Sequence, residues 1–136
     1  MTGEASWPLQ QAIYARLSAT PAVAGATQGI FDTPPQKPVY PFIHLDGGNV
    51  RDWSATTFDG QEHRVLVHVW SAAPGQAEVK ALMAAVYDAL NNAPLAPAGH
   101  QLVNLRFEFA EILFEADPAL IHAIMRFRAV TLALVP

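Results

Sequence analysis

The chain has 136 residues and no cysteine; hydrophobic residues make up 51% of it, charged residues only 15%, and its net charge is −4 at pH 7. This composition excludes a disulfide scaffold, a thiolate metal site, a disordered chain and a broad basic face for nucleic acid, and no apolar run reaches the length of a membrane span. We expect one domain over residues 1–136 of a soluble cytosolic protein, with a subunit interface because so little of the surface can be charged.

The first predicted helix covers residues 7–20, where Leu9, Ile13 and Leu17 recur at every fourth position. Thr20 ends it, because the residue before a proline is pushed out of the α region. Residues 30–32 could form a short strand, and residues 39–45 are predicted as a strand because they are rich in β-branched and aromatic side chains.

A polar loop is predicted over residues 46–60, longer than the two to five residues usual for a hairpin. It contains two aromatic residues, which a merely solvated loop would not need. Trp53 either folds back onto its own domain or anchors a partner, because aromatic side chains and arginine are enriched at interface cores. We expect a subunit interface that includes Arg51, Asp52, Trp53 and Phe58.

The second half of the chain predicts a strand, a helix and two long strands. Residues 62–71 alternate between apolar and polar, residues 74–91 carry apolar side chains at helical spacing, and two strand-like segments follow at 102–115 and 119–134. Short connections make the strands antiparallel. The predicted fold is α+β: an antiparallel sheet of about four strands with two helices packed on one face, in the order α-β-β-α-β-β.

The last two strands also predict a register. A two-residue connection at Asp117-Pro118 pairs Ala116 with Ala119. The apolar residues are even-numbered near the connection and odd-numbered further back, so we expect a β-bulge near Ala110-Glu111 to absorb the change of face. The expected pairs are Phe114 with Ile121, Ile112 with Ala123, Phe109 with Met125, Phe107 with Phe127 and, on the other face, Glu108 with Arg126.

Four of the six arginines lie on predicted strands, and the residues that alternate with them along each strand are apolar. One face of the sheet should therefore be apolar, and the other should mix arginines with glutamates. That polar face is either a set of cross-strand ion pairs, or a contact surface for another protein or the wall of an aqueous channel. Its residues are Arg64, Arg106, Arg126 and Arg128 with Glu62 and Glu108.

The residues that could support catalysis form no recognised motif. His44 and Asp46, joined by a distant His100 or His122, would imitate the two-histidine, one-carboxylate triad of non-haem iron enzymes, but that chemistry normally sits in an all-β barrel. We expect His44 at a strand end and Asp46 at a turn. Glu108, Glu111 and Glu115 are expected to be solvated, and no nucleophile elbow or phosphate loop occurs. We predict no catalytic residue, metal or cofactor.

The chain resembles the tail-completion or tail-terminator proteins of long-tailed bacteriophages and phage-derived gene transfer agents. The similarity spans nearly the whole chain, and its motifs are short and structural. They are LQQAIYARL from Leu9, Tyr40-Pro41-Phe42-Ile43, Val69-Trp70-Ser71 followed by Gly75, Tyr87-Asp88-Ala89-Leu90, and Phe127-Arg128-Ala129-Val130-Thr131.

The resemblance implies a structural protein without catalytic activity. It implies a hexameric ring at the head-proximal end of the tail tube, which stops tube polymerisation and joins the tail to the head connector. DNA would pass through the lumen without sequence-specific binding, and no membrane is involved. The alternative is a small metal-dependent or ligand-binding enzyme domain. A ring protein should carry no stoichiometric metal and should associate with itself or with tails.

Overall fold

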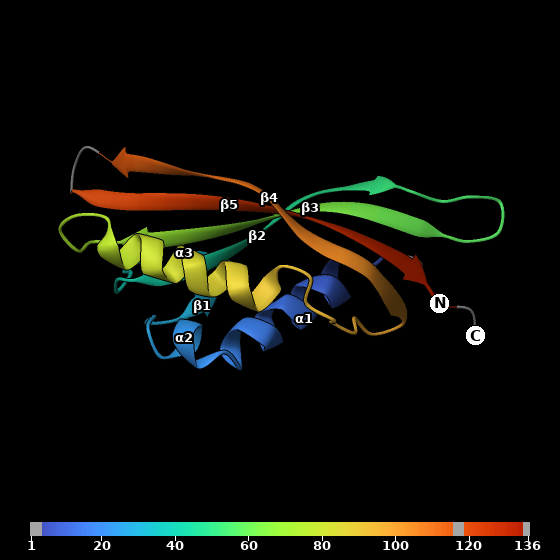
Figure 1. Ribbon diagram of the computed structural model, residues 1–136, viewed down its shortest axis with the longest axis horizontal. Coiled ribbons are helices and arrows are strands. Elements are labelled where there is room, and N and C mark those ends of the chain that lie inside the picture. Colours follow the sequence, from blue (N-terminus) through green and yellow to red (C-terminus); the bar gives the residue numbers. More distant parts are fainter. Residues whose placement is uncertain (1–3, 116–118, 135–136) are drawn as a thin grey trace.

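The computed structural model describes residues 4–115 and 119–134. One twisted sheet has the strand order β1-β2-β3-β5-β4, in which β1 runs parallel to β2 and the other neighbours are antiparallel. The helices cover only one face of this sheet, and the other face is open (Figure 1). The elements in chain order are α1 (Ser6–Ser18), α2 (Pro21–Ala24), β1 (Ile30–Phe31), β2 (Phe42–Asp52), β3 (Gly60–Ser71), α3 (Ala77–Leu90), β4 (His100–Glu115) and β5 (Leu120–Ala133).

The hydrophobic core lies between the helices and the covered face of the sheet. Leu9, Ile13 and Leu17 form the buried stripe of α1, as their spacing predicts, and α3 buries an equivalent stripe. Phe127 of β5 is fully buried beneath them. Each large apolar side chain removed from water contributes about 1.5–3 kcal/mol, so these two stripes anchor both helices to the sheet.

The α+β class and the placement of helices on one face are confirmed, but the strand count and element order differ from the prediction. The sheet has five strands, because Ile30–Phe31 adds a short parallel strand beside Ile43 and His44. A four-residue helix, α2, follows α1 directly. The order is therefore α-α-β-β-β-α-β-β.

The loop predicted over residues 46–60 is mostly strand. β2 continues to Asp52 and β3 begins at Gly60, so the two strands form a long hairpin whose far end extends beyond the helices (Figure 1). Gly47 and Gly48 form a β-bulge between Asp46 and Asn49. Gly48 has a φ of 61°, and a Cβ there would collide with the carbonyl oxygen of Arg64, so the bulge requires glycine at this position.

The register of β4 and β5 matches the prediction at three of the five pairs: Phe114 faces Ile121, Ile112 faces Ala123, and Phe107 faces Phe127. The predicted position of the bulge is wrong. Pairing is unbroken through Ala110, and the shift lies between Phe107 and Phe109, at Glu108.

Because the bulge lies there, Phe109 faces Arg126 rather than Met125. Glu108 is the unpaired bulge residue, and it meets Arg126 through its side chain instead of as a strand partner. A second bulge lies between Leu102 and Asn104. The predicted connection at Ala116, Asp117 and Pro118 lies outside the described residues.

Candidate interaction surface

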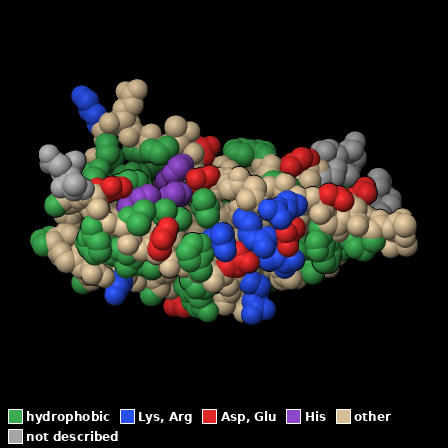
Figure 2. Space-filling view, turned by 90° about the horizontal axis from the view of Figure 1, so that it is seen from above, with side chains coloured by type: hydrophobic (Ala, Val, Ile, Leu, Met, Phe, Trp, Pro, Cys, Tyr) green, Lys and Arg blue, Asp and Glu red, His purple; other side chains and the backbone are tan. Residues whose placement is uncertain are grey.

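The open face of the sheet carries most of the polar residues that the sequence singles out. Figure 2 looks onto this face and shows a group of histidines beside apolar side chains, and next to it a cluster of arginines and acidic residues. The side chains come from alternate positions of β2, β3 and β5 and from β4. The residues between them point to the other face and are buried under the helices, as Val65, Val67 and Val69 are.

Three arginines and two glutamates form a connected set of ion pairs across β3, β5 and β4, and we call it the ion-pair network. Glu62 binds Arg64 at 3.0 Å and Arg128 at 2.6 Å, and Glu108 binds Arg64 at 2.9 Å and Arg126 at 3.0 Å. The hydrogen bond that Arg128 donates lowers the pKa of Glu62. The network holds its charged groups in fixed positions, because each carboxylate bridges two guanidinium groups.

The structure thus brings Arg64, Arg126 and Arg128 together with both glutamates. Arg126 also lies 4.5 Å from the centre of the Phe109 ring, a cation–π contact. Arg106 is exposed on the same face and faces Arg128 across the strands, and none of the ion pairs found among the described residues includes it.

A column of three histidines lies beside the ion-pair network and was not predicted from the sequence. The rings of His44 and His68 stack at 5.1 Å, and those of His68 and His122 at 4.9 Å. His68 Nδ1 lies 2.7 Å from His122 Nε2, and its Nε2 lies 3.2 Å from Asp46 Oδ2. Trp70 stacks on His122 with ring centres 3.8 Å apart.

Burial in this column lowers the pKa of His122 to about 4, and the neighbouring His68 and His44 add to the effect. Burial also lowers the pKa of His68. Burial raises the pKa of Asp46, but hydrogen bonds from the Gly48 N–H and from His68 outweigh it and leave the pKa lowered. His68 and His122 are therefore uncharged at neutral pH.

The iron-type triad considered from the sequence does not form. The residues that the structure describes include no group of three or more histidine, aspartate or glutamate side chains arranged to hold a metal ion. His44 and Asp46 each contact His68, while His100 Nδ1 lies 2.9 Å from the carbonyl oxygen of Ala98 at the start of β4. Asp46 is part of β2 rather than of a turn.

The candidate interface residues gather at the far end of the β2–β3 hairpin. The rings of Trp53 and Phe58 pack on each other at 5.8 Å, and Trp53 remains 42% exposed. Ser54 Oγ donates to Asp52 and accepts a hydrogen bond from the Gly60 N–H, which closes the turn. Arg51 and Asp52 are exposed. Trp53 thus packs on its own hairpin and still presents a large part of its ring to a partner.

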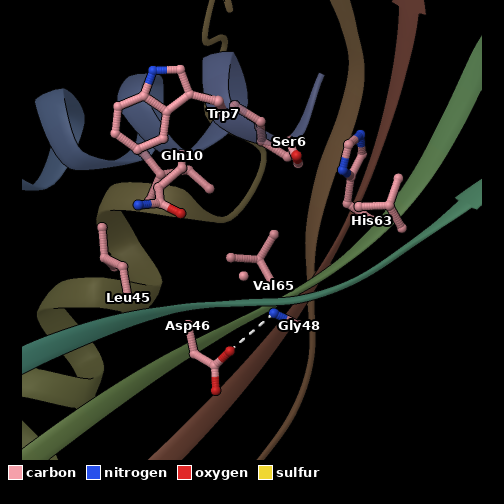
Figure 3. A pocket seen from close by; sticks show the side chains of 12 residues that line it. Ser6, Trp7, Gln10, Leu45, Asp46, Gly48, His63 and Val65 are labelled. Atoms are coloured by element: carbon pink, nitrogen blue, oxygen red, sulfur yellow. Dashed lines mark hydrogen bonds between the residues drawn. The ribbon is translucent and has the colours of Figure 1, made fainter. Parts of the chain in front are cut away.

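A groove opens between α1 and the edge of β2. It has a volume of about 300 Å³, and its lining includes Trp7 and Gln10 from α1 and Leu45 and Gly48 from β2 (Figure 3). An adjoining groove of about 520 Å³ continues toward β1 and shares Trp7, Gln10 and Leu45 with it. No sequence motif indicated these grooves, because their walls come from segments that are distant along the chain.

These features define a class: an α+β protein with one covered and one open sheet face, surface grooves, and no metal-binding cluster among its described residues. A family model described as "Tail completion protein gp17" matches residues 11–132, and the chain belongs to that family. No curated protein sequence matches the chain. None of the described helices is long and apolar enough to cross a lipid bilayer.

Two solved structures are similar in fold. One is a chain of the "Virion of native gene transfer agent (GTA) particle", with 29% identity, a TM-score of 0.85, and coverage of 97% of this chain and 100% of the other. The second is the gp17 protein of bacteriophage SPP1, with 22% identity, a TM-score of 0.65, and coverage of 96% and 91%. The second similarity concerns the fold alone.

Proposed function

We propose that this chain is a structural subunit of a phage-like particle that caps the head-proximal end of the tail tube as a ring. In this role it stops tube polymerisation and joins the tail to the head connector. The observation that carries the proposal is the full-length match, at a TM-score of 0.85, to a chain of a gene transfer agent virion. The family match over residues 11–132 supports the same role.

The proposed ring is a hexamer formed by residues 1–136 as one domain. The chain has only 15% charged residues, and several large apolar side chains are exposed on its surface. Exposed apolar surface of this kind is typical of proteins that associate. The proposed partners are further copies of the chain, the tail tube protein and the head–tail connector protein.

The open sheet face is proposed as the wall of the DNA channel. Its arginines are Arg64, Arg106, Arg126 and Arg128. Glu62 and Glu108 pair with three of them in the ion-pair network and offset two of the four positive charges. A guanidinium that is held by a carboxylate binds a phosphate less readily, because the phosphate must displace the carboxylate. DNA can then pass along this face without being retained, and no base-specific contact is required.

The hairpin end is proposed as a contact with a neighbouring subunit or the tail tube. If Trp53 is an anchor there, Trp53→Ala should weaken association by about 2 kcal/mol or more, as truncation of interface hot spots does. Thermal unfolding of the isolated protein should change little, because the Trp53 ring packs on Phe58 rather than on the core. Thr56→Ala, at an exposed position of the same turn, is the matched control.

For Trp53→Ala, two quantities are measured: its incorporation into tails and its melting temperature. A variant that is incorporated normally but melts early would show that Trp53 serves only its own hairpin.

The role itself is tested by deleting the gene in a producing strain. Tails of irregular length that fail to join heads are expected, and particles of normal length and full transfer activity would refute the role.

Catalysis is not part of the proposal. Apart from Arg106, the arginines and glutamates predicted for the polar face of the sheet are held in ion pairs, and His68 and His122 bind each other. We therefore propose no cofactor and no substrate. The metal-dependent form of the alternative has no metal-binding cluster in the described part of the chain to support it.

A further inference from the structure

We propose that successive copies of the chain meet through two unlike flanks of the sheet. The α3–β4 flank of one copy would pack on the α1–β2 flank of the next, with β4 adding as an antiparallel strand to the free edge of β2. The inference rests on the proposed ring and names the surfaces that build it. It is independent of the contact proposed for the hairpin end.

The α3–β4 flank is apolar and has a strand edge that is unpaired over part of its length. β4 is the last strand of the sheet, and only one of its edges pairs with a strand, β5. On its other edge, Asn91 and Asn92 at the end of α3 already bind the Phe107 N–H and the Leu105 carbonyl, so the proposed pairing uses the part of the edge beyond Phe107. Phe114 is 64% exposed and Tyr87 of α3 is 40% exposed. Between α3 and β4 lies a groove of about 300 Å³ whose lining includes Met83, Tyr87 and Phe107. A long exposed edge with large apolar side chains promotes association with another chain unless it is covered.

The α1–β2 flank offers a second unpaired edge beside a different apolar surface. β1 pairs with β2 only at Ile43 and His44, so the edge of β2 beyond His44 has no strand beside it. Trp7 of α1 is 58% exposed and, with Tyr14, lines the groove of about 520 Å³ that opens next to this edge. Figure 3 shows the adjoining groove of about 300 Å³, in which the Trp7 ring and the Gln10 side chain lie on the α1 side and Leu45 lies on the β2 side.

The strand directions of the two edges are complementary. β2 is antiparallel to β3, β3 to β5, and β5 to β4, so β4 runs antiparallel to β2. A rotation about an axis roughly parallel to the strands would bring β4 of one copy beside β2 of the next in the antiparallel orientation. The backbone N–H and C=O groups of β4 beyond Phe107, which the end of α3 does not bind, could then pair with those of the β2 edge.

A second copy is the occupant that covers both flanks at once. The two flanks are unlike, so their contact is heterologous, and repeated heterologous contacts form a ring when the rotation closes. In a closed ring every copy has both edges covered. A different partner on one flank would leave the other edge, with its aromatic side chains, exposed on each copy.

The absence of native cysteine makes the proposal directly testable by cross-linking. Gln11→Cys lies on the exposed side of α1 and Ala84→Cys on the exposed side of α3, and each residue lines the groove of its own flank. Particles would be purified from a strain whose only copy of the gene carries both substitutions, and treated with a flexible bismaleimide. The expected result is a ladder of cross-linked oligomers on a denaturing gel, with no ladder from either single variant.

Incorporation of the double variant without a ladder would overturn the proposal, and so would a dimer from Gln11→Cys alone, which indicates a symmetric contact. If the double variant is not incorporated, charged substitutions decide. Tyr14→Asp and Tyr87→Asp should each reduce incorporation at least about tenfold, whereas Ala22→Asp on exposed α2 should not. The melting temperature should stay unchanged in Tyr14→Asp and should fall in Tyr87→Asp, because the Tyr87 ring packs on Phe107 at 5.2 Å. Incorporation of both tyrosine variants at the wild-type level would refute the flank contact.

These outcomes separate the flank contact from the proposed function. Absence of the wild-type protein from particles, or normal tails in the deletion strain, would contradict the tail-end role itself. Presence in particles together with a missing ladder would contradict only the contact between the α3–β4 and α1–β2 flanks.

Discussion

Protonation of His122 and His68 in the histidine column should destabilise the fold below neutral pH, and His122 should account for most of the effect. Its pKa is about 4 in the folded protein, against 6.5 for an exposed histidine. Between these two values the unfolded chain binds a proton that the folded protein does not, so the free energy of unfolding falls as the pH falls. A pKa difference of about 2.5 corresponds to about 3 kcal/mol, and most of it is lost by about pH 4.5. His68 and His63 shift in the same direction, because burial lowers the pKa of each.

The substitution His122→Phe tests this assignment, because it retains a ring that can stack on Trp70 and removes the titrating group. Urea unfolding at a series of values between about pH 7.5 and pH 4.5 should show a loss of about 2–3 kcal/mol in the wild-type protein. In His122→Phe the loss should be smaller by about that amount, whatever the variant's stability at pH 7.5. Trp70→Phe, which keeps the imidazole, should retain the pH dependence. If His122→Phe and the wild-type protein lose stability in parallel, the column is not the cause.

Three further predictions concern the bulge, the ion-pair network and metal content. Gly48→Ala should lower the free energy of unfolding by about 2–4 kcal/mol, because it places a Cβ at positive φ against the Arg64 carbonyl. The control Gly47→Ala should cost less than about 1 kcal/mol, because its Cβ would meet nothing within 4 Å. Equal losses of the two variants in urea unfolding would contradict the bulge geometry. Glu108→Gln should cost up to about 1 kcal/mol at low salt and less in about 1 M NaCl, because it weakens the partly exposed pairs with Arg64 and Arg126; a loss that is independent of salt would point to packing instead. Elemental analysis of the purified protein should find no stoichiometric iron or zinc, and one tightly held ion per chain would require a different account of the histidines.

The elements that the sequence predicts well are those with a repeating apolar pattern. Leu9, Ile13 and Leu17 define α1, and the alternation of β3 places His63 and Val65 on the covered face, as observed. The far half of β2 was predicted as loop because its side chains are exposed on both faces, so no alternation marks it as a strand. Pairing with β3 holds it extended instead, and that pairing is not visible in a local pattern.

The misplaced bulge has a specific cause. Phe109 was interpreted as a core residue because it is aromatic, but it lies on the open face over the guanidinium of Arg126. Because Phe109 was counted among the core residues, the bulge was predicted near Ala110-Glu111, two residues beyond its observed position at Glu108. The histidine column was missed for a related reason: His44, His68 and His122 are far apart in sequence and meet only through the register of three strands.

The bulge at Glu108 also predicts where members of this family can differ in length without changing fold. Phe107 lies on the covered face and Phe109 on the open face, so β4 would alternate normally if Glu108 were absent. Glu108 is therefore equivalent to a single residue inserted into an otherwise regular strand. A relative that lacks this residue can keep every other side chain of β4 on its present face. It would lose only the carboxylate that joins Arg64 to Arg126, which is one of the two negative charges in the ion-pair network.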